Sequence, residues 1–364
     1  MQATVPPLLR RIGFFILTLE LPLAPLTAQQ AERYTISGGD VAIYNLAGEV
    51  KVEPGSGAVI AEVVRGGADA AKLKVLKGEI DGWETLRVTY PADRIQYGQL
   101  SDGSSTQLRV RENGTFGDDR DGDDHEREGK QRGKRIIIAG RGGGLDAHAN
   151  LRVTVPPGKR VAIYLAVGKV SVTNVDGDLW VDAASAPVTT SGTRGELNID
   201  VGSGAVQVTE ARGELSVDTG SGIVAVSGVR GEKVSIDTGS GDVTASDVRS
   251  NELHIETGSG AIEVTGLVAP QVALETGSGS IAADVQGEVW NVNVQTGSGD
   301  VTLKLPSTLG AEVDIETSSG EIETDFAVSV TRHARDHLTG RIGDGRGKIA
   351  IETGSGGIKL FKGQ

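Results

Sequence analysis

The chain has 364 residues, of which 53 are glycine, none is cysteine and 4% are aromatic, and its formal net charge is −13. The lack of cysteine excludes disulfides, thiolate metal sites and cysteine nucleophiles. The negative charge argues against a general affinity for nucleic acid.

Residues 1–28 have the features of a cleaved signal peptide. Arg10 and Arg11 supply a positive region, residues 12–19 supply most of an apolar one, and the small residues Thr27 and Ala28 precede a polar start. An uncleaved anchor is the alternative, for which the apolar run is short. No later stretch is apolar enough to span a membrane. We therefore expect a mature chain without a transmembrane segment, exported to the periplasm or to the cell surface.

Two different regions follow the signal. Residues 32–97 contain short runs of alternating apolar and polar residues, which is the pattern of half-buried strands. This region is either the irregular start of the repeats described next or a small separate β domain. Residues 98–133 are dominated by charge, with acidic and basic side chains throughout 118–128, and we expect a flexible loop there.

A Gly-Ser-Gly tripeptide recurs along the second half of the chain at steps of 18, 19, 19, 19 and 20 residues. Each copy lies between two short apolar–polar alternations, as in Leu215-Ser-Val-Asp-Thr-Gly-Ser-Gly-Ile-Val-Ala-Val226. Self-similarity at a fixed short period is the mark of a repeat architecture. The first glycines of the regular copies are Gly202, Gly220, Gly239, Gly258, Gly277 and Gly297.

Two topologies fit this repeat. Each copy is either a hairpin closed by Gly-Ser-Gly or one coil of a β-solenoid, in which equivalent strands of successive copies stack in parallel about 4.8 Å apart. The nearly constant spacing favours stacking. We therefore predict an all-β fold, a single-stranded β-solenoid (β-helix) with about 18–20 residues per coil. The repeats occupy residues 134–364, with an insertion at 326–347 that we expect to cap the stack.

Stacking would place like residues above one another in columns. A serine column and a threonine column flank the glycine turn, and their hydroxyls are expected to hydrogen-bond along the stack and to satisfy turn backbone groups. No histidine accompanies these positions, so the repeat offers no base for a serine nucleophile. The two columns are Ser203, Ser221, Ser240, Ser259, Ser278, Ser298 and Ser355, and Thr219, Thr238, Thr257, Thr276, Thr296 and Thr317.

An acidic column should face solvent. Carboxylates stacked at strand spacing repel one another, and a divalent cation such as calcium could bridge them, although the glycine-rich nonapeptide of calcium-binding β-rolls is absent. Full exposure to water is the simpler account. The column comprises Asp200, Asp218, Asp237, Glu256, Glu275, Glu316 and Glu352, with Gln295 interrupting it.

Two further patterns have the spacing of metal ligands. Asp119, Asp121 and Asp123 resemble the start of an EF-hand loop, but the turn glycine and the twelfth-position glutamate are missing. His333 and His337 have the four-residue spacing of a helical metal pair without a third ligand, and an exposed turn or short helix is the simpler account. The sequence therefore predicts no catalytic residue, cofactor or metal.

The Thr-Gly-Ser-Gly-Asp-Val phrase at 238–243 and 296–301 and the segment 338–356 resemble a bacterial family of exported β-strand-repeat proteins called putative adhesins, whose function is unassigned. The resemblance covers about residue 32 to the C-terminus apart from the charged loop. It implies a cell-envelope location and a β-strand repeat, and it transfers no functional residue.

These observations predict a non-enzymatic adhesin, scaffold or binding module of the cell envelope. Its partner would be an unknown envelope protein or a surface polymer. The alternatives are a purely structural periplasmic protein and a β-helix enzyme acting on polysaccharide. The enzyme would need clustered acids and aromatic sugar platforms, whereas the repeats contain only Trp180 and Trp290.

Overall fold

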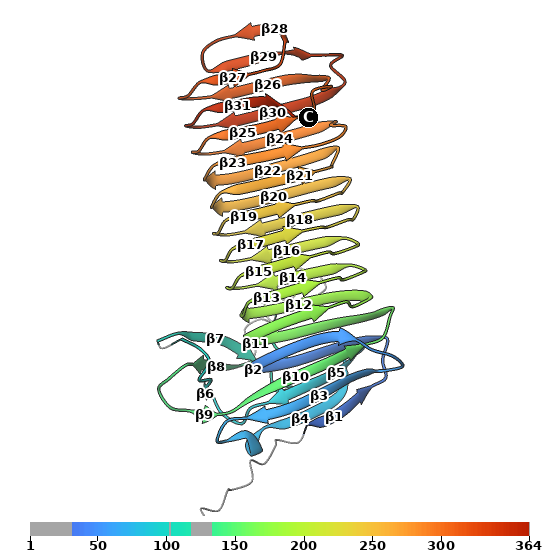
Figure 1. The fold of residues 1–364 in the computed structure, drawn as a ribbon. Coiled ribbons are helices and arrows are strands. Elements are labelled where there is room, and N and C mark those ends of the chain that lie inside the picture. Colours follow the sequence, from blue (N-terminus) through green and yellow to red (C-terminus); the bar gives the residue numbers. More distant parts are fainter. Residues whose placement is uncertain (1–30, 102, 118–132, 364) are drawn as a thin grey trace, which may run out of the picture.

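The computed structural model describes residues 31–101, 103–117 and 133–363, and these ranges form an elongated all-β stack of flattened coils (Figure 1). Within them, no helix has the length and apolarity of a membrane span. The expected signal peptide, residues 1–28, lies outside the described residues. The β-solenoid predicted from the repeats is confirmed.

Each regular coil contributes one strand to each of two facing walls. Successive strands of a wall pair in parallel, and the partner of each residue is its equivalent in the next repeat, so that Leu215 pairs with Val234 and Asp218 with Asp237. We call the first wall the acidic wall. Its strands are β12 (Gly177–Ser185), β14 (Leu197–Val201), β16 (Leu215–Thr219), β18 (Lys233–Thr238), β20 (Glu252–Ser259), β22 (Gln271–Ser278), β24 (Asn291–Thr296), β26 (Ala311–Thr317) and β30 (Gly347–Thr353).

We call the facing wall the hydroxyl wall, and its strands are shorter. It follows the same parallel register, in which Val206 pairs with Val224 and Thr209 with Ser227. Its strands are β13 (Val188–Ser191), β15 (Val206–Thr209), β17 (Val224–Ser227), β19 (Val243–Ser246), β21 (Ile262–Leu267), β23 (Ile281–Val285), β25 (Val301–Leu305), β27 (Ile322–Thr324) and β31 (Ile358–Lys362).

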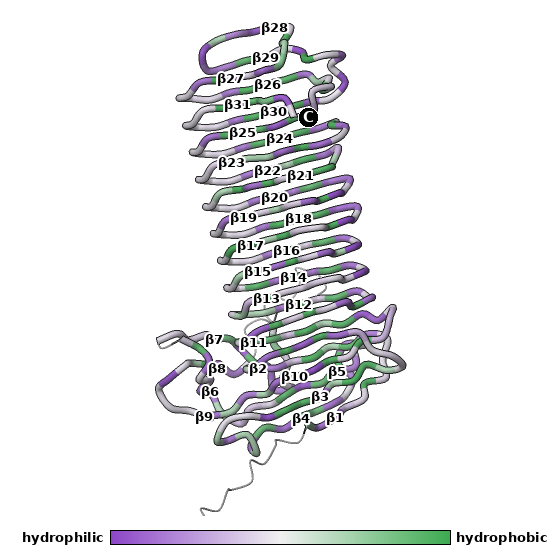
Figure 2. Tube along the Cα trace, viewed as in Figure 1, coloured by the Kyte–Doolittle hydropathy of each residue, from purple (hydrophilic) through white to green (hydrophobic). Residues whose placement is uncertain are grey.

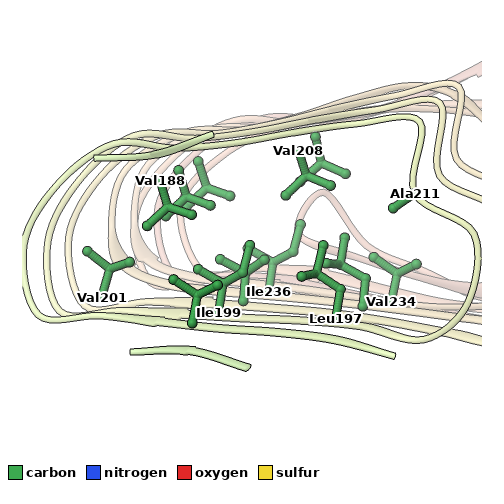
Figure 3. Close-up of a cluster of buried hydrophobic side chains, with 14 of the residues drawn as sticks. Val188, Leu197, Ile199, Val201, Val208, Ala211, Val234 and Ile236 are labelled. Carbon is green, nitrogen blue, oxygen red and sulfur yellow. The ribbon is translucent and has the colours of Figure 1, made fainter. Parts of the chain in front are cut away.

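The core is a column of aliphatic side chains between the two walls (Figure 3). Alternate residues of each strand point inward, such as Leu197 and Ile199 from one wall and Val208 from the other, and each is at most 2% exposed. The same alternation appears along the stack as regularly repeated apolar and polar positions (Figure 2). Burial of aliphatic side chains at this level contributes roughly 2 kcal/mol each.

The N-terminal region continues the stack and closes it. Long strands β2 (Asp40–Pro54) and β11 (Lys159–Thr173) run through both walls and pair in parallel register, Val41 with Val161 and Val50 with Val170. The strands within residues 32–89 therefore lie in the same sheet as the repeats, as an irregular start of the solenoid would, whereas residues 94–96 do not. The strands that complete this end are β1 (Glu32–Ile36), β3 (Val59–Gly66), β4 (Lys74–Ile80), β5 (Trp83–Thr89) and β10 (His148–Val155), with a short 3₁₀ turn at Ala70–Lys72.

The expectation of a flexible loop at 98–133 is wrong for residues 105–110. Residues 105–110 form β7 (Ser105–Val110), which pairs antiparallel with β8 (Lys134–Ala139) in a small second sheet. This sheet also contains β6 (Arg94–Gln96) and β9 (Leu145–Asp146). The prediction that the solenoid repeats begin at residue 134 is therefore wrong for residues 134–146. Residues 118–132 lie outside the described residues.

The C-terminal end departs from sequence order. Strand β30 pairs with β24 on one side and with β26 on the other, and β31 lies in the same way between β25 and β27. The last copy of the repeat is thus inserted beneath the copy that precedes it in sequence (Figure 1). The segment 326–347 forms strands β28 (Val328–His333) and β29 (His337–Ile342), and β29 pairs antiparallel with β26. This hairpin covers the free edge of the acidic wall.

Candidate binding surfaces

The Gly-Ser-Gly turn requires glycine because the turns of neighbouring coils touch. A Cβ atom on Gly222 would lie 2.1 Å from the carbonyl oxygen of Gly204 in the preceding coil, and Gly222 has φ +147°. Neither the contact nor the conformation suits an L side chain. This corner is therefore an exposed backbone ridge whose repetition is dictated by stacking.

The threonine column lies inside the coil, next to this ridge. In the later coils each hydroxyl donates to the carbonyl of a turn glycine in an adjacent coil, as Thr276 Oγ1 does to Gly260 O at 3.0 Å. The same bond is made by Thr257, Thr296, Thr317 and Thr353. The predicted role in satisfying turn backbone groups is confirmed for these residues. The hydroxyls of Thr219 and Thr238 are equally buried but have no hydrogen-bond partner.

The serine column lies on the outer side of the same turn. Ser203 Oγ donates to Ser185 Oγ of the preceding coil at 3.1 Å. From Ser221 to Ser355 the serines of the column are exposed to solvent. They give the ridge a polar outer edge.

The acidic column has the predicted register. Asp200 pairs with Asp218, Asp218 with Asp237, and Glu275 with Gln295. Burial raises the pKa of Asp218, and the neighbouring carboxylate of Asp237 raises it further, which is the electrostatic effect expected of stacked carboxylates. At the end of the column, Glu352 lies between Gln295 and Glu316, because β30 is inserted there.

The hydroxyl wall has a different chemistry. From β13 to β19 its outward positions carry no charge and are mostly hydroxyl side chains in register, with Ser191, Thr209, Ser227 and Ser246 in one column. Thr189, Gln207, Ala225 and Thr244 form the column beside it. The two walls thus present opposite surfaces, one anionic and one neutral and hydrogen-bonding.

A basic column lies at the third corner of the coil, which is the turn that leads from a hydroxyl-wall strand to the next acidic-wall strand. It was not predicted from the sequence. Single parallel bridges connect Arg194, Arg212, Arg230 and Arg249 in successive coils. Arg230 forms an ion pair with Asp247 at 2.9 Å. The sequence does contain a pattern that could have predicted this column. The phrase Arg-Gly-Glu recurs at 194–196, 212–214 and 230–232, at the repeat spacing of 18 residues. In each of these three coils a glutamate follows two residues after the arginine.

The other patterns with metal-ligand spacing do not form a metal site in the described residues. His333 and His337 lie at the turn of the β28–β29 hairpin and not on a helix, and His337 Nε2 is 2.9 Å from Asp314 Oδ1. Asp119, Asp121 and Asp123 lie outside the described residues. Across the ranges that the structure describes, no three His, Asp or Glu side chains come together as a metal site would need.

This architecture defines a β-solenoid protein with extended, repetitive surfaces. A family model described as Toastrack DUF4097 matches residues 149–360. That match spans more than half of the chain, and the chain therefore belongs to this family. The family name states no activity, and no curated protein matches the chain.

Two solved structures are similar at low identity. One is a putative adhesin from Bacteroides fragilis NCTC 9343, with 12% identity, coverage of 91% of this chain and 96% of that chain, and a TM-score of 0.30. The other is a putative cell adhesion protein from Clostridium sporogenes ATCC 15579, with 9% identity, coverage of 92% and 100%, and a TM-score of 0.19. At these TM-scores neither likeness carries an argument about function.

Proposed function

We propose that this chain is a non-enzymatic binding or scaffold module of the bacterial cell envelope, exported to the periplasm or to the cell surface. The observation that supports it is the constancy of the columns. Identical side chains recur at strand spacing over many coils, so a polymer or a partner protein meets the same chemistry repeatedly. Many weak contacts then combine into useful affinity by avidity, without one deep pocket. The partner is an envelope protein or a surface polymer.

The test has two parts. Fractionation of cells, with protease treatment of intact cells, is expected to place the chain in the envelope; retention in the cytoplasm would contradict the proposal. The purified chain is then incubated with solubilised envelope proteins and with isolated surface polysaccharide, and it should retain one of them. Release of new reducing ends from the polysaccharide would show an enzyme instead.

Paired variants can identify the wall that binds. Lysine substitutions T209K, S227K and S246K add charge to the hydroxyl wall, and D200K, D218K and D237K change the acidic wall. All six positions face outward, so the fold should persist in both triple variants, which circular dichroism can check. Loss of binding in one triple variant alone identifies the wall that binds. Unchanged binding in both variants would show that neither wall is the binding surface.

A further inference from the structure

Three loops converge at the third corner near the C-terminal end, where the last coil is inserted. They are residues 286–290, 306–310 and 343–347. The backbone N–H of Lys348 donates to Trp290 O at 2.8 Å, and that of Gly347 donates to Gly310 O at 2.8 Å. Because β30 lies between β24 and β26, loops that are distant in sequence are held side by side here.

A cavity of about 940 Å³ opens among these loops. This volume is within the range of small-ligand sites. Side chains of several chemical types line it, namely Glu288, Trp290, Thr308, Asp344 and Arg346. Three of the regular corners instead carry the short Arg-Gly-Glu phrase, at 194–196, 212–214 and 230–232.

Trp290 is the distinctive member of this cavity. Its side chain is 60% exposed, the largest exposure among the large apolar side chains of the described residues. The other two tryptophans are half-buried and pack against the core, and the guanidinium of Arg160 lies 5.6 Å from the ring centre of Trp83. An indole left in water beside a cavity offers a flat apolar face to a ligand.

The charges around the indole favour a neutral ligand over an anionic one. Arg346 donates from its Nε to Asp344 Oδ2 at 2.6 Å. Hydrogen bonds from the backbone and the side chain of Arg346 lower the pKa of Asp344, so this carboxyl is ionised and the arginine is already paired. Glu288 adds a further exposed carboxylate. The lining therefore carries one more negative than positive charge.

We propose that this cavity binds a neutral pyranose unit of an oligosaccharide. The C–H face of the sugar ring stacks on the indole of Trp290, and its hydroxyls exchange hydrogen bonds with Asp344, Glu288 and Arg346. The proposal rests on the proposed function, because it names the chemical class of one polymer that the module would bind.

The experiment is a titration of the full chain with cellohexaose, followed by calorimetry and by tryptophan fluorescence. Hexagalacturonate is the acidic counterpart, and tetramethylammonium is the cationic probe. We expect saturable binding of cellohexaose with a blue shift of the exposed tryptophan, and weaker binding of hexagalacturonate. W290A should weaken binding at least about tenfold, since aromatic contacts contribute on that scale. W290F should retain part of the affinity.

The matched control is I223A, which removes another apolar side chain of similar exposure, 58%, far from this cavity. It should bind as the unmodified chain does. Absence of saturable binding of cellohexaose, or equal binding by W290A, would overturn the site. Equal or stronger binding of hexagalacturonate would overturn the neutral preference. Saturable binding of tetramethylammonium that displaces the sugar would identify a cation site instead.

The two proposals fail separately. If W290A still retains the envelope partner while the unmodified chain binds no oligosaccharide, the module stands and the sugar site is wrong. If the chain is retained in the cytoplasm, the envelope function is wrong, and the titration still decides the sugar site by itself.

Discussion

The regular coils and the C-terminal end are built from the same repeat but assembled in different ways. From β14 to β23 the neighbours of each strand in space are the adjacent copies in sequence. At the end, β30 and β31 separate β24 and β25 from β26 and β27. In the regular coils, local spacing alone specifies the neighbours. At the C-terminal end, β30 and β31 follow the coil of β26 and β27 and the β28–β29 hairpin in sequence, yet they pair with β24 and β25.

The largest expected effect comes from removing the inserted coil. Truncation after Asp344 deletes β30 and β31, whose Ile349, Ile351, Ile358 and Leu360 are at most 2% exposed and contribute roughly 2 kcal/mol each. The coil above would lose its parallel partner and leave open strand edges. We expect a melting temperature lowered by at least about 10 °C, or aggregation, measured by circular dichroism and size-exclusion chromatography.

Deletion of a regular coil is the matched control. Removing residues 220–238 joins Thr219 to Gly239 and restores the repeat phrase. Because each coil contacts only its neighbours, the shortened chain should still fold; it loses the contribution of one coil but leaves no open strand edge. Unfolding of this deletion, or full stability of the truncation, would contradict the comparison.

Substitution of the turn glycines should have the next largest effect. G222A places a methyl group 2.1 Å from Gly204 O and also strains the backbone, so we expect a loss of about 3 kcal/mol. Gly228 has φ +67° but nothing closer than 3.5 Å to its virtual Cβ, so G228A should cost only about 1 kcal/mol. Chemical denaturation measures both, and equal losses would show that contact between coils is not the cause.

Valine substitutions at two buried threonines should change the stability of the chain in different directions. T276V removes the hydrogen bond to Gly260 O and should destabilise the chain by about 1 kcal/mol. T238V removes a buried hydroxyl without a partner and should leave stability unchanged or raise it by about 1 kcal/mol. The same denaturation series compares the two, and a loss at both positions would mean that Thr238 also forms a stabilising bond.

The smallest effect concerns the acidic column. The pKa of Asp218 is raised in the folded chain, so its ionised form costs stability at neutral pH, and this cost disappears as the pH falls below the ordinary carboxyl pKa. D218N should therefore raise the melting temperature at neutral pH by about 1 °C and leave it unchanged below about pH 3. D247N is the control, because it removes an ion pair with Arg230 and should give no increase.

Much of the solenoid could be predicted because stacking leaves a direct signature in the sequence. Equal spacing placed Asp200, Asp218 and Asp237 in one column, and the structure pairs them in that order. The hydrogen bond of Thr276 to a turn carbonyl was expected from the same register. The arginine column has an equally regular signature at 194, 212, 230 and 249, although it was not predicted.

The order of the last coils could not be predicted, and the reason is physical. Ile349 and Ile351 have the same alternation and the same side-chain type as the strands of every other coil, so the pattern does not distinguish one parallel neighbour from another. The small sheet was hidden for a different reason. Its strands β7 and β8 are separated in sequence by a charged segment. The apolar residues Leu108 and Val110 are too few to distinguish a strand from that segment by alternation alone.

The inserted coil also affects the order in which the molecule can be completed during synthesis. Strands β26 and β27 leave the ribosome before β30 and β31, yet their parallel partners are these later strands. The regular coils can form one after another as they emerge. The C-terminal end is completed only after its last strands are made, so a chain cut short before residue 347 would leave the strand edges that pair with β30 and β31 open.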